Sequence, residues 1–287
     1  MSVTTPASLR EVYASLDADP DAQLLAGGTD FMVEANFGHR RPSSVVALRN
    51  VRELRGWRRE HDTVIIGGAC TYLEMQSPTF TMLLPALGAA ARTVGSPQIR
   101  SVGTIGGNVA TASPAGDTLP VLAALDAHIT LGSSRGVRRV PLHEFIIGPK
   151  RTTRQHGEVI VDVRVPVLDG PQEYLKIGTR NAMVIAVADL ALVVDRRGQT
   201  VRCAMGSVGP TVLRAHAAEA WINDEIDWAV GAVTDTASTC QRFGALVAVD
   251  ARPIDDHRST AVYRRRGIEV LATRALGRAL ARLGGDA

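Results

Sequence analysis

The chain has 287 residues, of which 45% are hydrophobic and 21% are charged, so it can bury one large core or two smaller ones. Its net charge of +3 is too small by itself to indicate a nucleic-acid-binding protein. The three cysteines are far apart in sequence, which argues against a zinc ribbon or a cysteine-bound iron–sulfur cluster. No secretory signal and no membrane-spanning apolar stretch is visible. We therefore expect a soluble, cytoplasmic protein.

The first predicted elements lead to a pair of adjacent glycines. Apolar residues at helical spacing predict a helix over residues 8–16, and a short buried strand follows at Leu24-Leu25. The segment Ala26-Gly27-Gly28-Thr29-Asp30 comes next, and Asp30 is expected to cap a helix over residues 31–36. A helix start behind a glycine turn offers free amides to a phosphate. An isolated pair of glycines, however, is most often only a turn.

The next stretch reads as short strands and one good helix. Strands are predicted at residues 45–48 and 63–66, with a turn or brief helix between them. Gly67-Gly68 ends the second strand, and we interpret it as a plain connection into a helix start where Thr71 and Glu74 form a capping box. Residues 80–93, rich in alanine and leucine, predict one continuous helix.

The most informative segment runs over residues 94–126. At its centre, Gly106-Gly107 lies between Thr104 and Asn108, and no lysine stands nearby in sequence. Adjacent glycines permit positive φ and close approach of a ligand, and successive amides in such a turn can form an anion-binding nest. The segment therefore predicts a second cradle for a pyrophosphate, so that two cradles would hold one extended ligand.

Asp117 follows this segment and opens a predicted short helix over residues 118–127. A carboxylate there can either cap the helix or bind a ligand, and the sequence leaves both possibilities open. A hairpin at residues 128–131 and 137–140 and an alternating strand at 158–165 complete the first part. The turn-rich residues 168–171 predict a boundary between a domain over residues 1–167 and another over residues 168–287.

The second domain has a different pattern, an antiparallel meander followed by helices. Strands are predicted at residues 174–177, 184–194 and 200–206, and helices at 211–222, 228–243 and 256–283. Lys176 lies on a strand, where lysine is more often solvated, and we favour a turn-bracing role for Arg180. The arginine-rich last helix is interpreted as a solvated or subunit-facing surface, and the scattered histidines predict no metal site.

These motifs resemble the FAD-binding subunit of the molybdenum hydroxylases, the family of xanthine dehydrogenase and carbon monoxide dehydrogenase. Residues 26–30 are similar to the first flavin-binding loop of that family, and residues 96–127 to its second and more specific one. Residues 174–180 resemble its lysine-containing segment beside the flavin, and residues 255–265 the start of its C-terminal helix. The resemblance covers nearly the whole chain and looks closer to xanthine dehydrogenase than to carbon monoxide dehydrogenase.

The resemblance implies an α+β protein: a two-lobed FAD-binding domain of the vanillyl-alcohol-oxidase (PCMH) type, then a smaller domain of an antiparallel sheet plus helices. It assigns cofactor contacts along both glycine segments, with Ile160 packing on a ring and Lys176 approaching the isoalloxazine. The implied cofactor-binding residues are Leu24, Leu25, Ala26, Gly27, Gly28, Thr29, Asp30, Phe31, Val94, Gly95, Ile99, Thr104, Gly107, Asn108, Thr111, Asp117, Ile160 and Lys176.

The implied function is electron transfer within a hetero-oligomer, with no catalytic or metal-binding residue on this chain. Electrons would come from a subunit holding the molybdenum cofactor, cross [2Fe-2S] clusters on an iron–sulfur subunit, and reach NAD or another acceptor through FAD. The chain lacks the extra cluster-binding insertion of some family members. Two alternatives remain open: a self-contained FAD-dependent oxidase or reductase, and a flavin-free assembly subunit.

Overall fold

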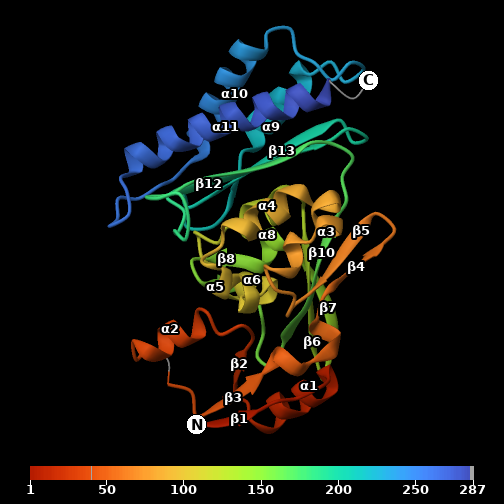
Figure 1. Cartoon of the computed structure of the whole chain (residues 1–287), viewed down its shortest axis with the longest axis vertical. Coiled ribbons are helices and arrows are strands. Elements are labelled where there is room, and N and C mark those ends of the chain that lie inside the picture. The colour runs from red at the N-terminus through yellow and green to blue at the C-terminus, as the bar shows by residue number, and fades with distance from the viewer. Residues whose placement is uncertain (40, 285–287) are drawn as a thin grey trace.

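The computed structural model describes residues 1–39 and 41–284 and shows three successive parts along the long axis of the molecule (Figure 1). The first lobe is a small parallel sheet with strand order β1-β3-β2, covered by one helix, and a second helix follows the loop after β2. Its elements are β1 (Ser2–Thr4), α1 (Leu9–Ala18), β2 (Gln23–Leu25), α2 (Phe31–Asn36) and β3 (Ser44–Ala47).

The second lobe is a five-stranded antiparallel sheet with order β4-β5-β10-β6-β7, against which short helices pack. Its strands are β4 (Trp57–Glu60), β5 (Thr63–Gly67), β6 (His128–Ser133), β7 (Gly136–Pro141) and β10 (Val159–Pro166), with the small pair β8 (Ile146–Gly148) and β9 (Arg151–Thr152). Its helices are α3 (Pro78–Leu83), α4 (Pro85–Thr93), α5 (Pro97–Val102), α6 (Ile105–Thr111), α7 (Thr118–Ala124) and α8 (Leu142–Phe145).

The third part is a four-stranded antiparallel sheet with order β11-β12-β13-β14, backed by three helices that lie at the top of Figure 1. Its strands are β11 (Gln172–Ile177), β12 (Ala188–Asp195), β13 (Thr200–Gly206) and β14 (Leu213–Arg214). Its helices are α9 (His216–Glu225), α10 (Thr236–Asp250) and α11 (Ala261–Leu283).

The sheet of the third part is buried on both faces. Leu190 and Leu192 of β12 pack with helices α9 to α11, whereas the alternate residues Ala191 and Val193 belong to the core of the second lobe. Because successive side chains of a strand point to opposite faces, one strand joins two cores. This junction is therefore a packed interior in which a polar side chain needs a partner.

The predicted α+β fold with an antiparallel sheet domain is confirmed, and several predicted boundaries are wrong. The helix predicted over residues 80–93 is interrupted at Leu84, because Pro85 has no amide to continue the ladder and starts α4 instead. Strand β4 was not predicted. Its sequence is polar and its arginines are exposed, so no apolar pattern predicts a strand there, but its backbone pairs with β5.

The predicted helices of the third part begin later than expected. The segment assigned to a helix from residue 211 first forms strand β14, and α9 begins at His216. Helix α10 begins at Thr236, where the Asp235 carboxylate accepts a hydrogen bond from the Ser238 amide. Within residues 1–39 and 41–284, no helix has the length and hydropathy needed to cross a membrane.

Candidate functional site

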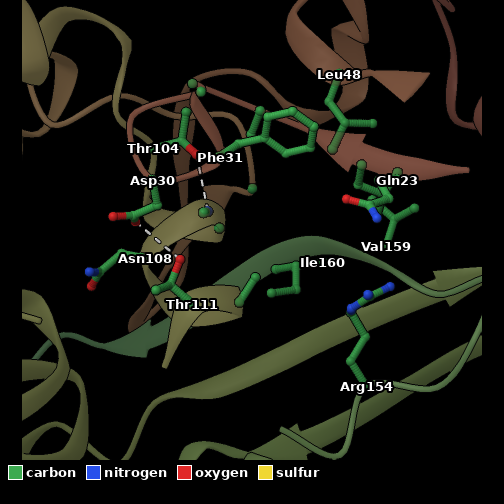
Figure 2. A pocket seen from close by; sticks show the side chains of 18 of the residues that line it. Gln23, Asp30, Phe31, Leu48, Thr104, Asn108, Thr111, Arg154, Val159 and Ile160 are labelled. Carbon is green, nitrogen blue, oxygen red and sulfur yellow. Dashed lines mark hydrogen bonds between the residues drawn. The ribbon is translucent and has the colours of Figure 1, made fainter. Parts of the chain in front are cut away.

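A cavity of about 550 Å³ lies between the first lobe and the second lobe, a volume within the usual range for cofactor sites. Figure 2 shows residues of both glycine segments and of β10 around it. Of the residues that the sequence assigned to the cofactor, those that line this cavity are Leu24, Ala26, Gly27, Gly28, Thr29, Asp30, Phe31, Thr104, Gly107, Asn108, Thr111 and Ile160.

The first glycine loop has the form expected of an anion cradle. Gly28 has φ +78°, a left-handed conformation that favours glycine, and a Cβ on Gly27 would lie 1.9 Å from the Val102 carbonyl oxygen. Within the described part of the chain, the backbone amides of residues 27–30 have no recorded hydrogen-bond acceptor. Because these amides line the cavity, they can donate to an anionic ligand.

The second glycine segment differs from its prediction. Gly106 and Gly107 do not form a turn with positive φ but lie in the first turn of α6. The amides of this helix start already have partners in the protein: Ile105 N donates to Cys70 O, Gly106 N to Gly68 O, and Gly107 N to Thr104 Oγ1. The predicted second amide nest is therefore wrong, and this segment presents side chains to the cavity instead.

Asp30 and Thr111 connect the two glycine segments. Asp30 was expected to cap α2, but its side chain makes no capping hydrogen bond and accepts one from Thr111 Oγ1 at 3.1 Å (Figure 2). Nearby, Asn108 accepts a hydrogen bond from Thr118, which fixes the carboxamide so that its NH₂ group remains a potential donor. One neutral donor, the Asn108 NH₂ group, is thus available in the cavity that residues 27–30 also line.

The glycine pair Gly67-Gly68 also contributes to the site through Gly68, although the sequence analysis interpreted this pair as a plain connection between a strand and a helix. Gly68 lines the cavity, and its carbonyl accepts from Gly106 N at 3.0 Å. A Cβ on Gly68 would lie 2.2 Å from the Ile160 carbonyl oxygen, and one on Gly106 would lie 2.4 Å from the Gly68 carbonyl oxygen. Three backbone segments are therefore stacked with no room for a side chain between them.

One end of the cavity is formed by residues that the sequence analysis missed. Gln23, Val159 and Arg154 lie together there, away from Asp30 and Asn108 (Figure 2). The Gln23 Oε1 atom is buried and has no hydrogen-bond partner among the described residues. No motif marks Gln23, and alternation along β2 would not have revealed it, because the adjacent residues Gln23 and Leu24 both line the cavity while Leu25 does not.

Two basic side chains also line the cavity, although the residues next to the glycine pairs in sequence include no lysine. Lys150 and Arg154 reach it from the loops around β9. Arg154 Nη1 donates to the Glu158 carbonyl at 2.7 Å, while the Glu158 carboxylate is held by Arg138 at 2.6 Å and by the Gln155 amide at 2.6 Å. The Arg138 guanidinium holds the pKa of Glu158 below its usual range, so this wall is braced by an ionised carboxylate.

A second group of the assigned residues lies outside the cavity, and two of them, Asp117 and Lys176, lie where α4 and α7 meet the sheet of the third part. Lys176 Nζ donates to Asp117 Oδ2 at 2.6 Å and to the Thr93 carbonyl at 3.3 Å, and both charged side chains are nearly buried. Val94 and Gly95 follow Thr93 directly, Ile99 lies in α5, and Arg100 donates to the Val94 and Gly95 carbonyls. Leu25 lies on strand β2 and does not line the cavity either.

Asp117 occupies the N-cap position of α7 but makes no side-chain capping bond, so the helix-capping interpretation is wrong. Burial raises the pKa of the Asp117 carboxyl, and the Lys176 ammonium acts in the opposite direction. A lysine on a strand is usually exposed to solvent, but the Lys176 side chain is nearly buried. Arg180 braces its own turn through the Ala182 and Met183 carbonyls, as predicted.

Comparisons with known proteins agree with this architecture. Residues 1–168 match the family model described as the FAD binding domain in molybdopterin dehydrogenase, and residues 173–279 match the CO dehydrogenase flavoprotein C-terminal domain. The crystal structure of quinoline 2-oxidoreductase from Pseudomonas putida 86 superposes with a TM-score of 0.90 at 28% identity, covering 99% of this chain and 98% of that one.

Curated relatives match over nearly their whole length. The carbon monoxide dehydrogenase medium chain of Hydrogenophaga pseudoflava is 32% identical, covering 96% of both chains. The xanthine dehydrogenase FAD-binding subunit of Escherichia coli O157:H7 is 30% identical, covering 97% of this chain and 96% of the relative. These identities do not favour one subgroup over the other. The chain belongs to the FAD-binding subunits of the molybdenum hydroxylase family, and it is an oxidoreductase subunit.

Proposed function

We propose that the cavity holds FAD, with its pyrophosphate on the free amides of residues 27–30. The observation that carries this proposal is the first glycine loop, where unpartnered amides line the cavity and no Cβ fits at Gly27. Asn108 would add a neutral donor to the phosphates, and the Thr111 hydroxyl, which donates to Asp30, could accept a hydrogen bond from a ribityl hydroxyl. Phe31 and Ile160 would supply apolar contacts from opposite sides of the cavity.

The two halves of this cofactor would lie in different surroundings, the adenosine half at one end of the cavity and the isoalloxazine beyond the cavity, toward the third part. We place the adenosine half among Gln23, Val159 and Arg154, where a buried carboxamide can donate to and accept from a purine edge. The isoalloxazine would lie toward Val94, Asp117 and Lys176, where an ammonium favours extra negative charge on a reduced ring. We keep the division into residues 1–167 and 168–287 as part of this proposal, with the isoalloxazine at the boundary.

Bound FAD would supply two-electron and one-electron redox chemistry, which couples a two-electron acceptor to one-electron carriers. We propose that this chain passes electrons from the iron–sulfur subunit of a complex, reduced in turn by a molybdenum-cofactor subunit, to NAD or another acceptor. The carbon monoxide dehydrogenase medium chain of H. pseudoflava, by its name one chain of a larger enzyme, supports such a hetero-oligomer. The residues of this chain position the cofactor and act on no organic substrate.

The test is FAD titration of the purified full chain, followed by tryptophan and flavin fluorescence. We expect saturable one-to-one binding by the unmodified chain and by Gly277→Ala, whose new methyl group would lie 3.7 Å from the nearest atom, Cys240 Sγ. Gly27→Ala is expected to abolish binding. Equal FAD affinity for all three proteins would refute the placement of the pyrophosphate.

Co-purification tests the alternatives. Chains carrying molybdenum and iron–sulfur centres, recovered with an affinity-tagged copy from the native host, would support the electron-transfer subunit. A flavin-loaded chain that turns over an organic substrate without them would support a self-contained oxidase or reductase. A chain that recovers those partners but never binds FAD would support the flavin-free assembly role.

A further inference from the structure

The junction between α7 and the sheet of the third part contains two carboxylates and one cation. Asp189 lies on β12 directly opposite Lys176 on β11, and both side chains face the second lobe, as Asp117 does from the N-terminus of α7. Within the described part of the chain, the charged groups that act on the Asp189 carboxyl are Asp117 and Lys176. A fully ionised junction would therefore carry one uncompensated negative charge.

All three side chains are taken out of water. Asp189 is 0% exposed, and the side chains of Lys176 and Asp117 are 8% and 6% exposed. The free energy of burying a charge without a counterion is large enough that such a group takes up or releases a proton instead. One ammonium can neutralise one carboxylate, so the other carboxyl group is stable here only in its neutral form.

The contacts decide which carboxyl is ionised. Asp117 Oδ2 accepts a hydrogen bond from Lys176 Nζ at 2.6 Å, a charged donor that favours a carboxylate. The Thr93 hydroxyl lies 3.1 Å from the same oxygen, but it is shared with the Ala90 carbonyl at 2.9 Å. Asp189 Oδ2 accepts one neutral hydrogen bond, from Tyr174 at 3.1 Å. The Oδ1 atom of each carboxyl group has no partner among the described residues, so the two groups differ in the ammonium that contacts Asp117. The Ser207 hydroxyl, also buried and without a recorded partner, faces the same carboxyl.

We propose that Asp189 keeps its proton in the folded protein at neutral pH, and that this neutral acid positions Lys176 against Asp117. An ionised Asp189 would compete for the ammonium from across the strand pair and draw it away from Asp117. Neutral Asp189 leaves one closed ion pair, Lys176 with Asp117, at the boundary where we place the isoalloxazine. The functional part of this inference rests on the proposed function, but the protonation state does not.

The groups around Asp189 act on its pKa in both directions. Burial is the largest cause and raises the pKa of Asp189 well above its usual range, and the Asp117 charge acts in the same direction. The Lys176 ammonium and the hydroxyl groups of Tyr174 and Ser207 lower it by less than burial and Asp117 raise it. Tyr174 on β11 is itself fully buried, and burial raises the pKa of its hydroxyl, so it remains a neutral donor. On the α11 side, Arg264 is committed to Asp256 at 2.6 Å and to the Ser207 carbonyl at 2.7 Å.

The first test compares the pH dependence of unfolding by urea for the full chain and for Asp189→Asn, which mimics a neutral carboxyl group. An acid whose pKa is raised on folding loses stability as the pH rises above its unfolded value of about 4. Relative to the unmodified chain, the folding constant of Asp189→Asn is therefore expected to rise about tenfold per pH unit above pH 4, up to the folded pKa. A constant ratio, or a ratio that falls, would overturn the proposal.

Asp117→Asn is the matched partner variant, because it removes the carboxylate that contacts Lys176. At pH 7 we expect Asp189→Asn to be at least as stable as the unmodified chain and Asp117→Asn to be less stable. The reverse order would assign the proton to Asp117 and refute the proposal.

Infrared spectroscopy supplies a readout that does not depend on stability or on FAD. The C=O stretch of a protonated carboxyl group is expected at pH 8 in the unmodified chain and in the control Asp256→Asn. It should be absent in Asp189→Asn. If Asp189→Asn does not fold, the spectrum of the unmodified chain decides: absence of this band at pH 8 would refute the proposal.

Discussion

The cavity between the lobes and the junction beneath the third part contain most of the residues that the sequence assigned to FAD, but they are built differently. The cavity presents backbone and side chains of three glycine-containing segments, with charged side chains such as Lys150 and Arg154 reaching it from other loops. The junction presents Asp117, Lys176 and Asp189, all side chains fixed by regular elements. The cavity should therefore be sensitive to added volume, and the junction to removed charge.

The largest expected effect is that of Gly27→Ala, which adds volume to the cavity wall. The new Cβ would lie 1.9 Å from a backbone oxygen, Val102 O, which cannot move aside as a side chain could. We expect a loss of more than about 4 kcal/mol in the free energy of unfolding, together with loss of FAD binding. The same change at Gly277, on helix α11, should instead stabilise the chain by about 1 kcal/mol in urea unfolding.

Lys176→Met tests the junction in the opposite way, by removing charge at nearly constant volume. It leaves the Asp117 carboxylate buried without a counterion, which should cost about 3 kcal/mol at pH 7. Adding Asp117→Asn to this variant should restore most of the lost free energy of unfolding, as measured by unfolding in urea. If the double variant is no more stable than Lys176→Met, the ion pair does not account for the stability of the junction.

Glu158→Gln tests a part of the cavity wall that is braced by charge. Because the pKa of Glu158 is lowered on folding, its stabilisation is present above the unfolded value of about 4.3 and is lost as the pH falls through the folded pKa. At pH 7 the variant should lose about 2 kcal/mol, since charge-assisted bonds to Arg138 and Gln155 weaken. Thermal unfolding should show that this difference shrinks toward pH 3.

The smallest expected effect is that of Gln23→Leu, which removes one neutral hydrogen-bonding group. If its carboxamide contacts the adenosine half, FAD should bind about tenfold more weakly, a loss of about 1.4 kcal/mol, while FMN affinity stays the same. Gln172→Leu is the matched control, because Gln172 also has a buried oxygen without a recorded partner but lies outside the cavity. Equal losses for FAD and FMN would contradict the proposed orientation.

Sequence alone predicted the fold class and the first cradle, because both depend on local patterns. Apolar periodicity located α1 and α11, and the pair Gly27-Gly28 after an apolar strand marked a loop that needs positive φ at Gly28. It misjudged Gly106 and Gly107. Their requirement for glycine comes from close packing of α6 on Gly68, a contact between segments that no local pattern encodes.

The parts of the site that depend on contacts distant in sequence could not be predicted. Gln23 comes from strand β2 of the first lobe and Arg154 from the loop after β9 of the second lobe, yet both line one end of the cavity. Neither residue lies in a motif. Asp189 stands in an apolar run, where its role depends on Lys176 opposite it on the next strand. Pairing across strands, rather than composition, decides which of these side chains meet.

The stack of Gly106 on Gly68, and of Gly68 on the Ile160 carbonyl, also limits how this enzyme family member could be redesigned. Main-chain atoms touch main-chain atoms there, so no choice of amino acid can widen or narrow that wall. Substitutions that allow the protein to accept a shorter or bulkier nucleotide analogue must therefore be made at the other end of the cavity. There the boundary consists of exchangeable groups such as Gln23, Leu48 and Val159.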